Sequence, residues 1–565
     1  MVTDAAYRPR RPEESLLYQV VAGELETFLA SQQDNERQVP GFVEKELRSF
    51  LDCGVLARGF LRIACHTCKL DRVVAFSCKS RGICPSCGGR RMADTAAHLV
   101  DRVIPDVPVR QWVLSPPHAM RYRIAYDSSL LAALIRIFIR AIFSSLRRRA
   151  RDCGIPRGQC GAVAFVQRFG SGVNLHPHVH VLLLDGVFAG LEKETPHFYP
   201  LRAPDDPDVA AVAETTSRRT QALLTRKGID ASSNEEDEDP LMRDTPWLAG
   251  LYAHGVRGRI ATGPNAGKGV TTWGGCGEVL EPEPSARRCA NVDGYSVHAN
   301  VSLPAHRREK LENLCRYMLR PPLAVERLER LSSGRLAYRM KTPWRDGTTH
   351  VVLSDGELLE KLAALVPAPR FHLVRYFGIL ASAAKQRASI VPLPPPAFTA
   401  ESCEHRNTAD EQNPRPRNYT WSQLMARVFA LDVLECPRCG SRMRILAAIE
   451  DPVVARKILD SLGLPSRPPP VAPARNLNPT LPNSDGERAA FADVYLRAGS
   501  LPAPAGDPAF KSVCTPERSL TPNATKLNFD RLPTRICTLA RSKTALDPAA
   551  CGFESYVCQT FALNL

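Results

Sequence analysis

Two histidines separated by one residue, His178 and His180, are the first side chains whose types and spacing predict chemistry. The segment around them, LHPHVHVLLL from residue 175, has the composition of a β-strand. Alternate residues of a strand project from the same face, so the two imidazoles can chelate one cation while Val179 points into the core. His176 shares their face. The pattern therefore predicts a metal site on one face of a sheet.

The apolar segment 161–169, which precedes a glycine-containing turn, supplies a candidate third ligand. This segment and the histidine strand read as a hairpin. If its turn pairs Phe169 with Asn174, Gln167 lies opposite His176 and on the histidine face. Histidine nitrogens combined with an amide oxygen and open positions suit Mg or Mn, bound transiently with a phosphate, better than a permanent zinc.

Two Cys-x-x-Cys pairs separated by fifteen residues predict a structural zinc site. The four ligands would be Cys65, Cys68, Cys84 and Cys87. Their spacing falls within the zinc-ribbon pattern, and four protein ligands would leave no position for a reactive water. Cys53 and Cys78 are the next candidates as ligands.

Cys436 and Cys439, in the sequence CPRCG, form half of a further site of this kind. They lack an obvious second pair. Cys403, His405 or a residue of another chain could complete the site. A second zinc site and a pair of free thiols are therefore both consistent with the sequence.

Tyr317 lies on the basic side of a predicted helix, with Lys310, Asn313, Arg316 and Arg320 beside it or one turn away. A tyrosine in this position can meet a phosphate. An unassisted phenol has a pKa of about 10, so a cation or metal must stabilise the phenolate before it can act as a nucleophile. The spacing alone fits an ordinary packing tyrosine equally well.

The elements that must position these side chains follow from the periodicity of apolar residues. Helices are expected at 14–31, 128–151, 304–319 and 355–365, and strands at 110–115, 294–303, 335–341 and 348–353, besides the hairpin at 161–184. Pro304 is a favoured first helical residue, and Pro321 and Pro322 end the helix that carries the tyrosine.

Composition and motifs divide the chain into four regions. They are an N-terminal helix with the zinc-binding segment (13–105), a region with the histidines and Tyr317 (106–395), a small module with the CPRC pair (418–465) and a tail (466–565). The tail is expected to be largely disordered, because a composition rich in Pro, Ser, Asn and Ala buries too little apolar surface to offset chain entropy.

The chain of 565 residues carries 74 Lys and Arg against 59 Asp and Glu, a formal charge of +15. This excess favours a polyanion as partner, since cationic surfaces gather phosphate backbones through counterion release. The candidate DNA contacts are Arg72, Lys79, Arg81, Arg90, Arg91, Arg147, Arg148, Arg149, Arg316 and Arg320. Arginines at the end of the helix 128–151 also complement its dipole, so a structural role is an equal alternative for them.

Other features exclude some classes of protein. The N-terminal residues lack the apolar core of a signal peptide, so a reducing cytoplasm is expected. The most apolar stretch, 130–143, is interrupted by two arginines and is shorter than the roughly 20 apolar residues that span a bilayer, so no membrane segment is expected. The GPNAGKG sequence at 263–269 lacks the spacing and the Ser or Thr of a phosphate loop, so no ATP is expected. The acidic run 235–239 reads as a solvated loop.

Five motifs in chain order resemble the rolling-circle transposases of the insertion sequence ninety-one (IS91) family, and among them the single-tyrosine common-region (ISCR) branch. They are FSCKSRGICPSC with the preceding cysteine pair, QRFGSGVNLHPHVHVLLLDGVF, LCRYMLRPPLA, KTPWRDGTTHV and LDVLECPRCGSRMRILAAIED, over about residues 13–465. The resemblance implies an α+β fold. An HUH-endonuclease antiparallel sheet with flanking helices would follow a zinc-ribbon-like, DNA-binding domain.

The resemblance also implies the site. His178 and His180 would hold Mg or Mn, with Gln167 as a third ligand, and Tyr317 would be the nucleophile. Family members with two tyrosines have them four residues apart, and the earlier position is Asn313 here, which favours the one-tyrosine type.

The implied reaction is the metal-dependent cleavage and rejoining of single-stranded DNA at element ends, through a 5′-phosphotyrosine and without ATP. Host replication machinery could extend the free 3′-hydroxyl while the displaced strand moves to a target, which places the protein in the cytoplasm at the nucleoid.

Two other classes account for part of the pattern. A non-catalytic zinc protein that regulates DNA explains the charge and the cysteines, but not His178, His180 and Tyr317 together. A metal-dependent hydrolase that uses water explains the histidines and leaves Tyr317 without a role.

Overall fold

The computed structural model describes residues 11–33, 38–190, 196–229, 239–274, 287–344, 346–392, 419–429 and 432–475. The acidic run up to residue 238, the alternative ligands Cys403 and His405, and the tail beyond residue 475 lie outside the described residues. Within these ranges the strands form four sheets, and the largest sheet carries the histidines.

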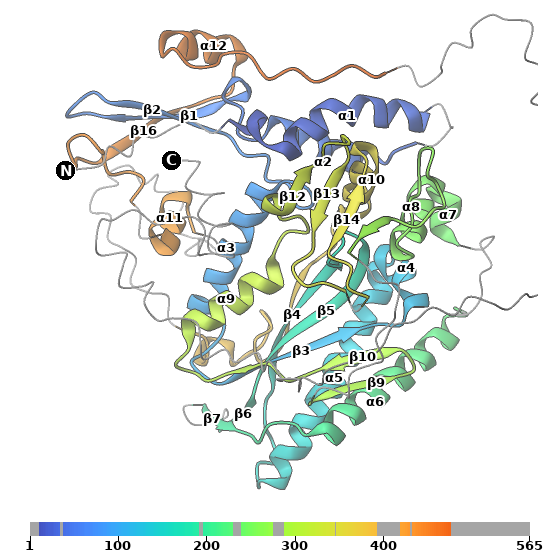
Figure 1. The fold of residues 1–565 in the computed structure, drawn as a ribbon. Helices are drawn as coiled ribbons and strands as arrows, with labels where there is room; N and C mark the ends of the chain where they lie inside the picture. Colours follow the sequence, from blue (N-terminus) through green and yellow to red (C-terminus); the bar gives the residue numbers. More distant parts are fainter. Residues whose placement is uncertain are drawn as a thin grey trace, which may run out of the picture. The chain divides into compact units, whose positions relative to one another are not determined.

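The largest sheet has seven strands in the described residues, and each neighbouring pair is antiparallel (Figure 1). In spatial order they are β15 (Val374–Gly378), β4 (Gly161–Phe169), β5 (Leu175–Leu184), β3 (Val109–Ser115), β10 (Tyr295–His298) and β9 (Cys289–Val292), with β11 (Ser302–Leu303) also paired to β3. The predicted hairpin and the strand at 110–115 are confirmed as β4, β5 and β3. The strand predicted at 294–303 is divided into β10 and β11, which both pair with β3.

Helices cover both faces of this sheet. They are α5 (Ser128–Asp152) and α6 (Asp206–Arg226) on one face, and α3 (Pro85–Arg102) and α9 (Arg308–Leu319) on the other. Val179, Val181 and Leu183 of β5 belong to the apolar cluster of α5 and α6, whereas Leu182 and Leu184 belong to that of α3 and α9. Because the side chains of a strand alternate, the even-numbered residues of β5 point toward α3 and α9.

Helix α5 confirms the helix predicted at 128–151. Asp127 caps it by accepting hydrogen bonds from the backbone N–H groups of Ser129 and Leu130. By length and composition α5 is apolar enough to cross a membrane, although the sequence suggested a shorter apolar stretch. In the protein 61% of its most apolar window is buried, and this surface packs on the sheet and α6. The apolar residues of α5 thus build the core.

Helix α9 begins at Arg308, four residues later than predicted, because Pro304 lies in a turn closed by a hydrogen bond from the Arg307 N–H to its carbonyl. It ends at Leu319, as expected. Helix α10 (Asp355–Leu365) has the predicted bounds, since Ser354 and Glu357 form a capping box at its start. The predicted N-terminal helix is α1 (Leu16–Gln33).

A four-stranded sheet lies beside the tyrosine helix in sequence. Its strands are β12 (Leu328–Arg330), β13 (Leu336–Arg339), β14 (His350–Leu353) and β8 (Thr271–Trp273), in this spatial order. The predicted strand pair at 335–341 and 348–353 is confirmed as β13 and β14, which are antiparallel. The loop between them contains the KTPWRDG motif.

The two cysteine-bearing ends of the chain share a three-stranded sheet. Its order is β16 (Met443–Ile449), β1 (Phe60–Cys65) and β2 (Asp71–Ala75). Figure 1 shows the orange β16 lying beside the blue β1 and β2. The segment 418–465, which was predicted as a separate small module, therefore contributes a strand to the N-terminal zinc-binding region, because its apolar residues pair and pack there.

The remaining elements complete the layers. They are α2 (Gly41–Asp52), α4 (His118–Tyr126), β6 (Gly186–Ala189), β7 (His197–Pro200), α7 (Pro240–Asp244), α8 (Pro246–Val256), α11 (Trp421–Phe429) and α12 (Pro452–Ser461).

Candidate active site and cysteine clusters

Strand alternation brings the predicted histidines onto the face of the central sheet that α9 covers. The rings of His178 and His180 have centroids 5.0 Å apart, and Val179 between them is buried in the core of the opposite face. The His176 ring meets that of His178 in an edge-to-face arrangement, with centroids 5.2 Å apart. Its ligand atoms do not converge with those of the other two into a three-ligand cluster of the described residues. The pair His178 and His180 is thus the candidate chelate.

Burial keeps both imidazoles neutral. It lowers the pKa of His178 to about 4 and that of His180 to about 3, since the charged form loses its hydration. The Nδ1–H of His178 can donate to the carbonyl oxygen of His176 at 2.8 Å, which leaves Nε2 free to bind a metal. Neutral imidazoles with one nitrogen fixed in this way have the form that metal ligands take.

His180 is held by Gln111 of β3, whose side-chain amide lies 2.8 Å from Nδ1. The other ring nitrogen, Nε2, is buried and has no hydrogen-bond partner among the described residues. An amide can present either its nitrogen or its oxygen to Nδ1. Metal binding through Nε2 selects the oxygen, because Nδ1 then carries the proton.

Gln167 lies opposite His178, and not opposite His176 as predicted. Phe169 pairs with Leu175 instead of Asn174, and the register shifts by one more residue between Phe169 and Gln167. The two shifts together amount to two residues, so Gln167 stays on the histidine face. Its Nε2 donates to the carbonyl oxygens of Tyr317 and Met318 at 3.0 and 2.9 Å, while its Oε1 is buried without a partner in the described part of the chain. The amide oxygen is thus available as a ligand.

Tyr317, near the end of α9, meets the histidines. Its ring and that of His180 have centroids 6.1 Å apart in an edge-to-face arrangement. Two cations lie over the tyrosine ring: the Arg320 guanidinium at 4.9 Å and Lys341 Nζ at 5.4 Å. The helix and the sheet therefore bring together one phenol, two imidazoles, one amide and two cations.

Some of the arginines predicted to contact DNA are buried or are paired with other groups of the protein. Arg149 is 2% exposed and donates to the carbonyl of Arg202, so its role is structural and its prediction as a DNA contact is corrected. Arg316 is likewise held by Glu312 in the α3 and α9 interface. Arg148 is exposed but paired with Asp208.

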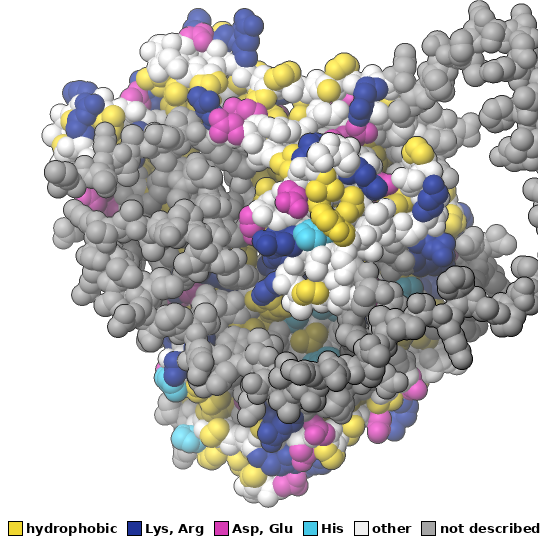
Figure 2. All heavy atoms as spheres, in the orientation of Figure 1, with side chains coloured by type: hydrophobic (Ala, Val, Ile, Leu, Met, Phe, Trp, Pro, Cys, Tyr) yellow, Lys and Arg dark blue, Asp and Glu magenta, His cyan; other side chains and the backbone are white. Residues whose placement is uncertain are grey.

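The other cations near the cysteines and at the end of α5 reach the surface in varying degrees. Arg147 is exposed and lies over the ring of Phe143. Arg81 and Arg91 are exposed and donate to the carbonyls of Phe371 and Lys79 respectively, whereas Arg72 and Arg90 are half-buried. On the face drawn in Figure 2, Lys and Arg are interspersed with Asp and Glu. Among the side chains coloured on this face, Lys and Arg do not form one continuous basic patch.

Sequence reasoning missed Gln111, Lys341 and the exposed tryptophan Trp344. Gln111 could not be predicted as a site residue, since it lies within a strand that carries no recognisable motif. Lys341 and Trp344 belong to KTPWRDG, between two predicted strands. Its basic and aromatic residues are of the types that contact single-stranded DNA, so they could have been predicted. The indole N–H of Trp344 donates to Ser171 Oγ at 2.9 Å, so this loop lies against the hairpin turn of the histidine strands.

Eight of the twelve cysteines in the described residues form two clusters, and they divide the predicted zinc ligands between them. The first contains Cys53, Cys78, Cys84 and Cys87, with ligand atoms all within 4.8 Å of one another. Cys84 immediately precedes α3, and Cys87 lies in its first turn. The predicted grouping of this pair with Cys65 and Cys68 is therefore wrong. The next candidates, Cys53 and Cys78, are the actual neighbours because α2 ends beside the start of α3.

The second cluster contains Cys65, Cys68, Cys436 and Cys439. Sγ atoms of Cys65 and Cys439, and of Cys68 and Cys436, are 3.5 Å apart. Hydrogen bonds from the side chain and backbone of Ser441 lower the pKa of Cys439 to about 6, so this thiol is present largely as the thiolate that binds metal. Four cysteine sulfurs at these separations fit tetrahedral structural zinc.

Comparisons with known proteins address the whole arrangement. Residues 24–116 match a family model described as "Transposase zinc-binding domain", and residues 161–388 match one described as "Putative transposase". The chain is 24% identical over 407 residues to the transposase for insertion sequence element IS801 of Pseudomonas savastanoi pv. phaseolicola. The aligned region covers 71% of this chain and 82% of that protein. No solved structure matches the chain. With a zinc-binding region followed by a transposase region, the chain is thus similar to transposases of the IS91 and IS801 type.

Proposed function

We propose that this chain is a transposase of the HUH type, which cleaves and rejoins single-stranded DNA at element ends with Tyr317 as the nucleophile. The observation that carries the proposal is the convergence of three elements on one point. The Tyr317 ring lies 6.1 Å from that of His180, and Gln167 is hydrogen-bonded to the backbone of Tyr317. A protein that only binds DNA has no need for this arrangement.

His178, His180 and Gln167 fit a divalent cation such as Mg or Mn. The imidazoles are neutral, and both His180 Nε2 and Gln167 Oε1 are buried polar atoms without partners among the described residues. Such atoms are costly unless something binds them. When bound there, the cation supplies polarisation of the scissile phosphate and stabilises charge on the leaving oxygen.

The residues of the chain then account for the bond changes. The Tyr317 oxygen attacks phosphorus in line, a new oxygen–phosphorus bond forms, and the bond to the 3′-oxygen breaks. The phenolic proton passes to solvent, and the departing oxygen takes up a proton as the free 3′-hydroxyl. Arg320 and Lys341, which lie over the tyrosine ring, are placed to stabilise the negative charge of the phosphate. The 5′-phosphotyrosine retains the energy of the ester, so rejoining needs no ATP.

A single tyrosine would perform both cleavage and rejoining. On α9 the position four residues before Tyr317 is Asn313, which is exposed. This pattern supports the one-tyrosine mechanism of the common-region branch and a rolling-circle route in which host replication machinery extends the 3′-hydroxyl. Such a route places the protein at the nucleoid.

Exposed aromatic residues beside the site would hold the single strand. Trp344 is 40% exposed and Trp273 is 56% exposed, and Trp273 packs on the ring of His350 at 5.5 Å. Figure 2 shows hydrophobic side chains gathered with a histidine and with Lys and Arg near the centre of this face. Stacking of bases on aromatic rings is strong and tolerates any sequence. We assign these tryptophans to holding the strand near Lys341.

A covalent adduct tests the proposal. Wild-type protein is incubated with single-stranded DNA from the element end and Mg or Mn, and a protein–DNA adduct is sought after denaturation. We expect an adduct that is resistant to denaturation and absent in Tyr317→Phe. Cleavage that persists in Tyr317→Phe without an adduct would favour the hydrolase that uses water, and binding without cleavage would favour the regulator.

A further inference from the structure

The second cysteine cluster joins two parts of the chain that are remote in sequence. Cys65 and Cys439 are 374 residues apart, and Cys68 and Cys436 are 368 residues apart. The matched zinc-binding region ends at residue 116 and therefore contains only half of these ligands. The first cluster, in contrast, lies wholly within that region.

Both halves of the second cluster have the same local backbone. In each, the N–H of the residue after the second cysteine donates to the carbonyl of the first, from Lys69 to Cys65 at 3.0 Å and from Gly440 to Cys436 at 2.8 Å. Lys69 and Gly440 both have left-handed backbones, with φ of 59° and 70°. A left-handed backbone is strained for lysine and is retained where the surroundings fix it. Two tight turns with the same backbone conformation, whose thiols face each other, form a preorganised metal site.

The segment that supplies Cys436 and Cys439 also contacts the tyrosine helix. Met425 and Val433 are buried with Met92 of α3, and Leu319 of α9 packs against this cluster. The Tyr419 hydroxyl donates to Asp101 of α3 at 2.7 Å. Helix α11 thus lies against both α3 and α9.

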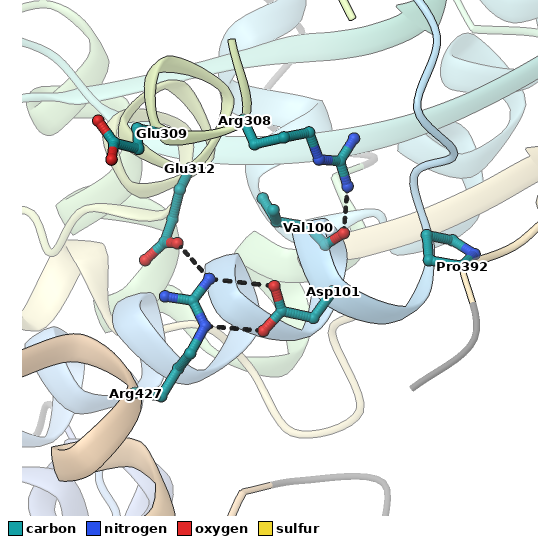
Figure 3. A pocket seen from close by; sticks show the side chains of 7 residues that line it. All are labelled: Val100, Asp101, Arg308, Glu309, Glu312, Pro392 and Arg427. Atoms are coloured by element: carbon teal, nitrogen blue, oxygen red, sulfur yellow. Dashed lines mark hydrogen bonds and ion pairs between the residues drawn. The ribbon is translucent and has the colours of Figure 1, made fainter. Parts of the chain in front are cut away.

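One arginine of α11 connects all three helices (Figure 3). Arg427 donates two hydrogen bonds to Asp101 of α3, at 2.8 and 3.0 Å, and a third to Glu312 of α9 at 2.7 Å. Glu312 also pairs with Arg316, which directly precedes Tyr317. A two-pronged pair of this kind fixes geometry as well as adding energy. The position of α9 therefore depends on Arg427.

We propose that zinc bound by Cys65, Cys68, Cys436 and Cys439 links the N-terminal region to the segment that follows α11 and holds α11 in place. Arg427 then acts as a positioning residue for Tyr317. The metal-site half of this inference stands on the cysteine geometry alone. The positioning half rests on the proposed function, because it takes Tyr317 as the nucleophile. The C-terminal pair is then required for activity, although it lies about 120 residues beyond the tyrosine in sequence.

Metal content tests the first half. Zinc per chain is measured for full-length wild type, for Cys436→Ser/Cys439→Ser, and for Cys153→Ser, an exposed cysteine outside both clusters. We expect the double variant to lose one zinc relative to wild type and Cys153→Ser to lose none. With Co(II) in place of zinc, the absorption of tetrahedral cobalt–thiolate sites should fall by about half in the double variant. Unchanged zinc and cobalt absorption would overturn the metal site.

The rate of adduct formation tests the second half. Arg427→Ala and Arg427→Lys are compared with Arg442→Ala, which removes an exposed pair with Asp432 in the same segment. We expect Arg427→Ala to retain its zinc and its affinity for single-stranded DNA, but to form the adduct about 10- to 100-fold more slowly, since small misplacements of a nucleophile are costly. Arg427→Lys should recover part of the rate, and Arg442→Ala should match wild type.

The possible failures are distinguishable. If wild type forms no adduct, the proposed function fails while zinc content still decides the metal site. If Cys436→Ser/Cys439→Ser loses its zinc and forms the adduct at the wild-type rate, the coupling is wrong. A fall in DNA affinity equal to the fall in rate for Arg427→Ala would also overturn the positioning role.

Discussion

The two faces of the central sheet are built from alternate residues of the same strand and are opposite in character. The odd-numbered residues Val179, Val181 and Leu183 of β5 are all buried among apolar side chains of α5 and α6. The even-numbered residues begin with His176, His178 and His180 and turn apolar only from Leu182 onward. A slip of one residue in register would exchange the two sets. The apolar face therefore fixes the register that aims the histidines at Tyr317.

The face of the sheet that carries the histidines and Gln167 lowers the stability of the fold, and packing on the apolar face must offset this cost. The histidine face holds two buried polar atoms without partners among the described residues, His180 Nε2 and Gln167 Oε1. Each unsatisfied group of this kind costs about 1–3 kcal/mol. A site that keeps such atoms is arranged for something that binds there, whereas the opposite face is arranged only for packing.

The largest effect should come from removing the proposed nucleophile, Tyr317, which faces the histidines. Tyr317→Phe keeps the ring and its contact with His180 but deletes the attacking oxygen. We expect adduct formation to fall by roughly 10⁴-fold or more, with single-stranded DNA affinity unchanged. Quantitative gel analysis of the adduct measures the rate, and a residual rate near that of wild type would move the chemistry to another residue.

Removing one imidazole should have the next largest effect. We expect His180→Ala to slow adduct formation by roughly 10²- to 10³-fold, because the scissile phosphate loses the cation that polarises it. His176→Ala is the matched control, since His176 lies on the same face but outside the proposed ligand set. Equal losses in the two variants would show that the face matters as a surface and not as a chelate.

The amide that orients His180 should matter less than the ligand itself. In Gln111→Leu the ring keeps its place but Nδ1 loses its partner, so we expect the Mn concentration for half-maximal adduct formation to rise about 10- to 100-fold. The rate at saturating Mn should change little. A lower rate with no change in Mn dependence would assign Gln111 to packing.

The exposed side chain of Trp344 should contribute to DNA binding and not to the chemical step. We expect Trp344→Ala to weaken binding of single-stranded DNA by about tenfold, because stacking of one base is worth about 1–3 kcal/mol. Trp344→Phe should retain most of the affinity. Fluorescence anisotropy with a labelled oligonucleotide measures both, and an unchanged dissociation constant for Trp344→Ala would remove this residue from the strand path.

The smallest effect on chemistry should come from the opposite face. Val181→Ala opens a cavity in a fully buried position and should lower the free energy of unfolding by about 2 kcal/mol. At a temperature where the protein stays folded, the adduct rate should remain within about twofold of wild type. Leu182→Ala, one residue along the strand, should lower stability and also slow the adduct, since it packs beside α9.

Much of the fold followed from local patterns in the sequence. The hairpin of β4 and β5, the long helix α5 and the bounds of α10 could be predicted because alternation, helical periodicity and the Ser354 cap act over a few residues. The start of α9 could not, because Pro304 suits a turn as well as a first helical position. The register error at Gln167 has a similar origin, since one extra residue in the turn and a second register shift between Phe169 and Gln167 displace the pairing by two residues.

The roles of charged residues were the least predictable. Arg149 and Arg320 look alike in the sequence, yet Arg149 is buried on a carbonyl and Arg320 lies over the Tyr317 ring. Long flexible side chains reach many partners, and only the fold decides which carboxylate or ring lies nearby. Asp101 and Arg427, which are 326 residues apart, had no pattern in common before α3 and α11 were seen to pack together.

The sequence by itself determined that His178 and His180 share a face and that each Cys-x-x-Cys pair can form half of a metal site, because strand alternation and tight turns are local. The tertiary structure decided which halves meet: Cys65 and Cys68 lie with Cys436 and Cys439, and not with the nearer Cys84 and Cys87. Neighbouring pairs can lie far apart once a strand or helix separates them. A metal needs four sulfurs at one point in space, and only the pairing of β1 with β16 brings them there.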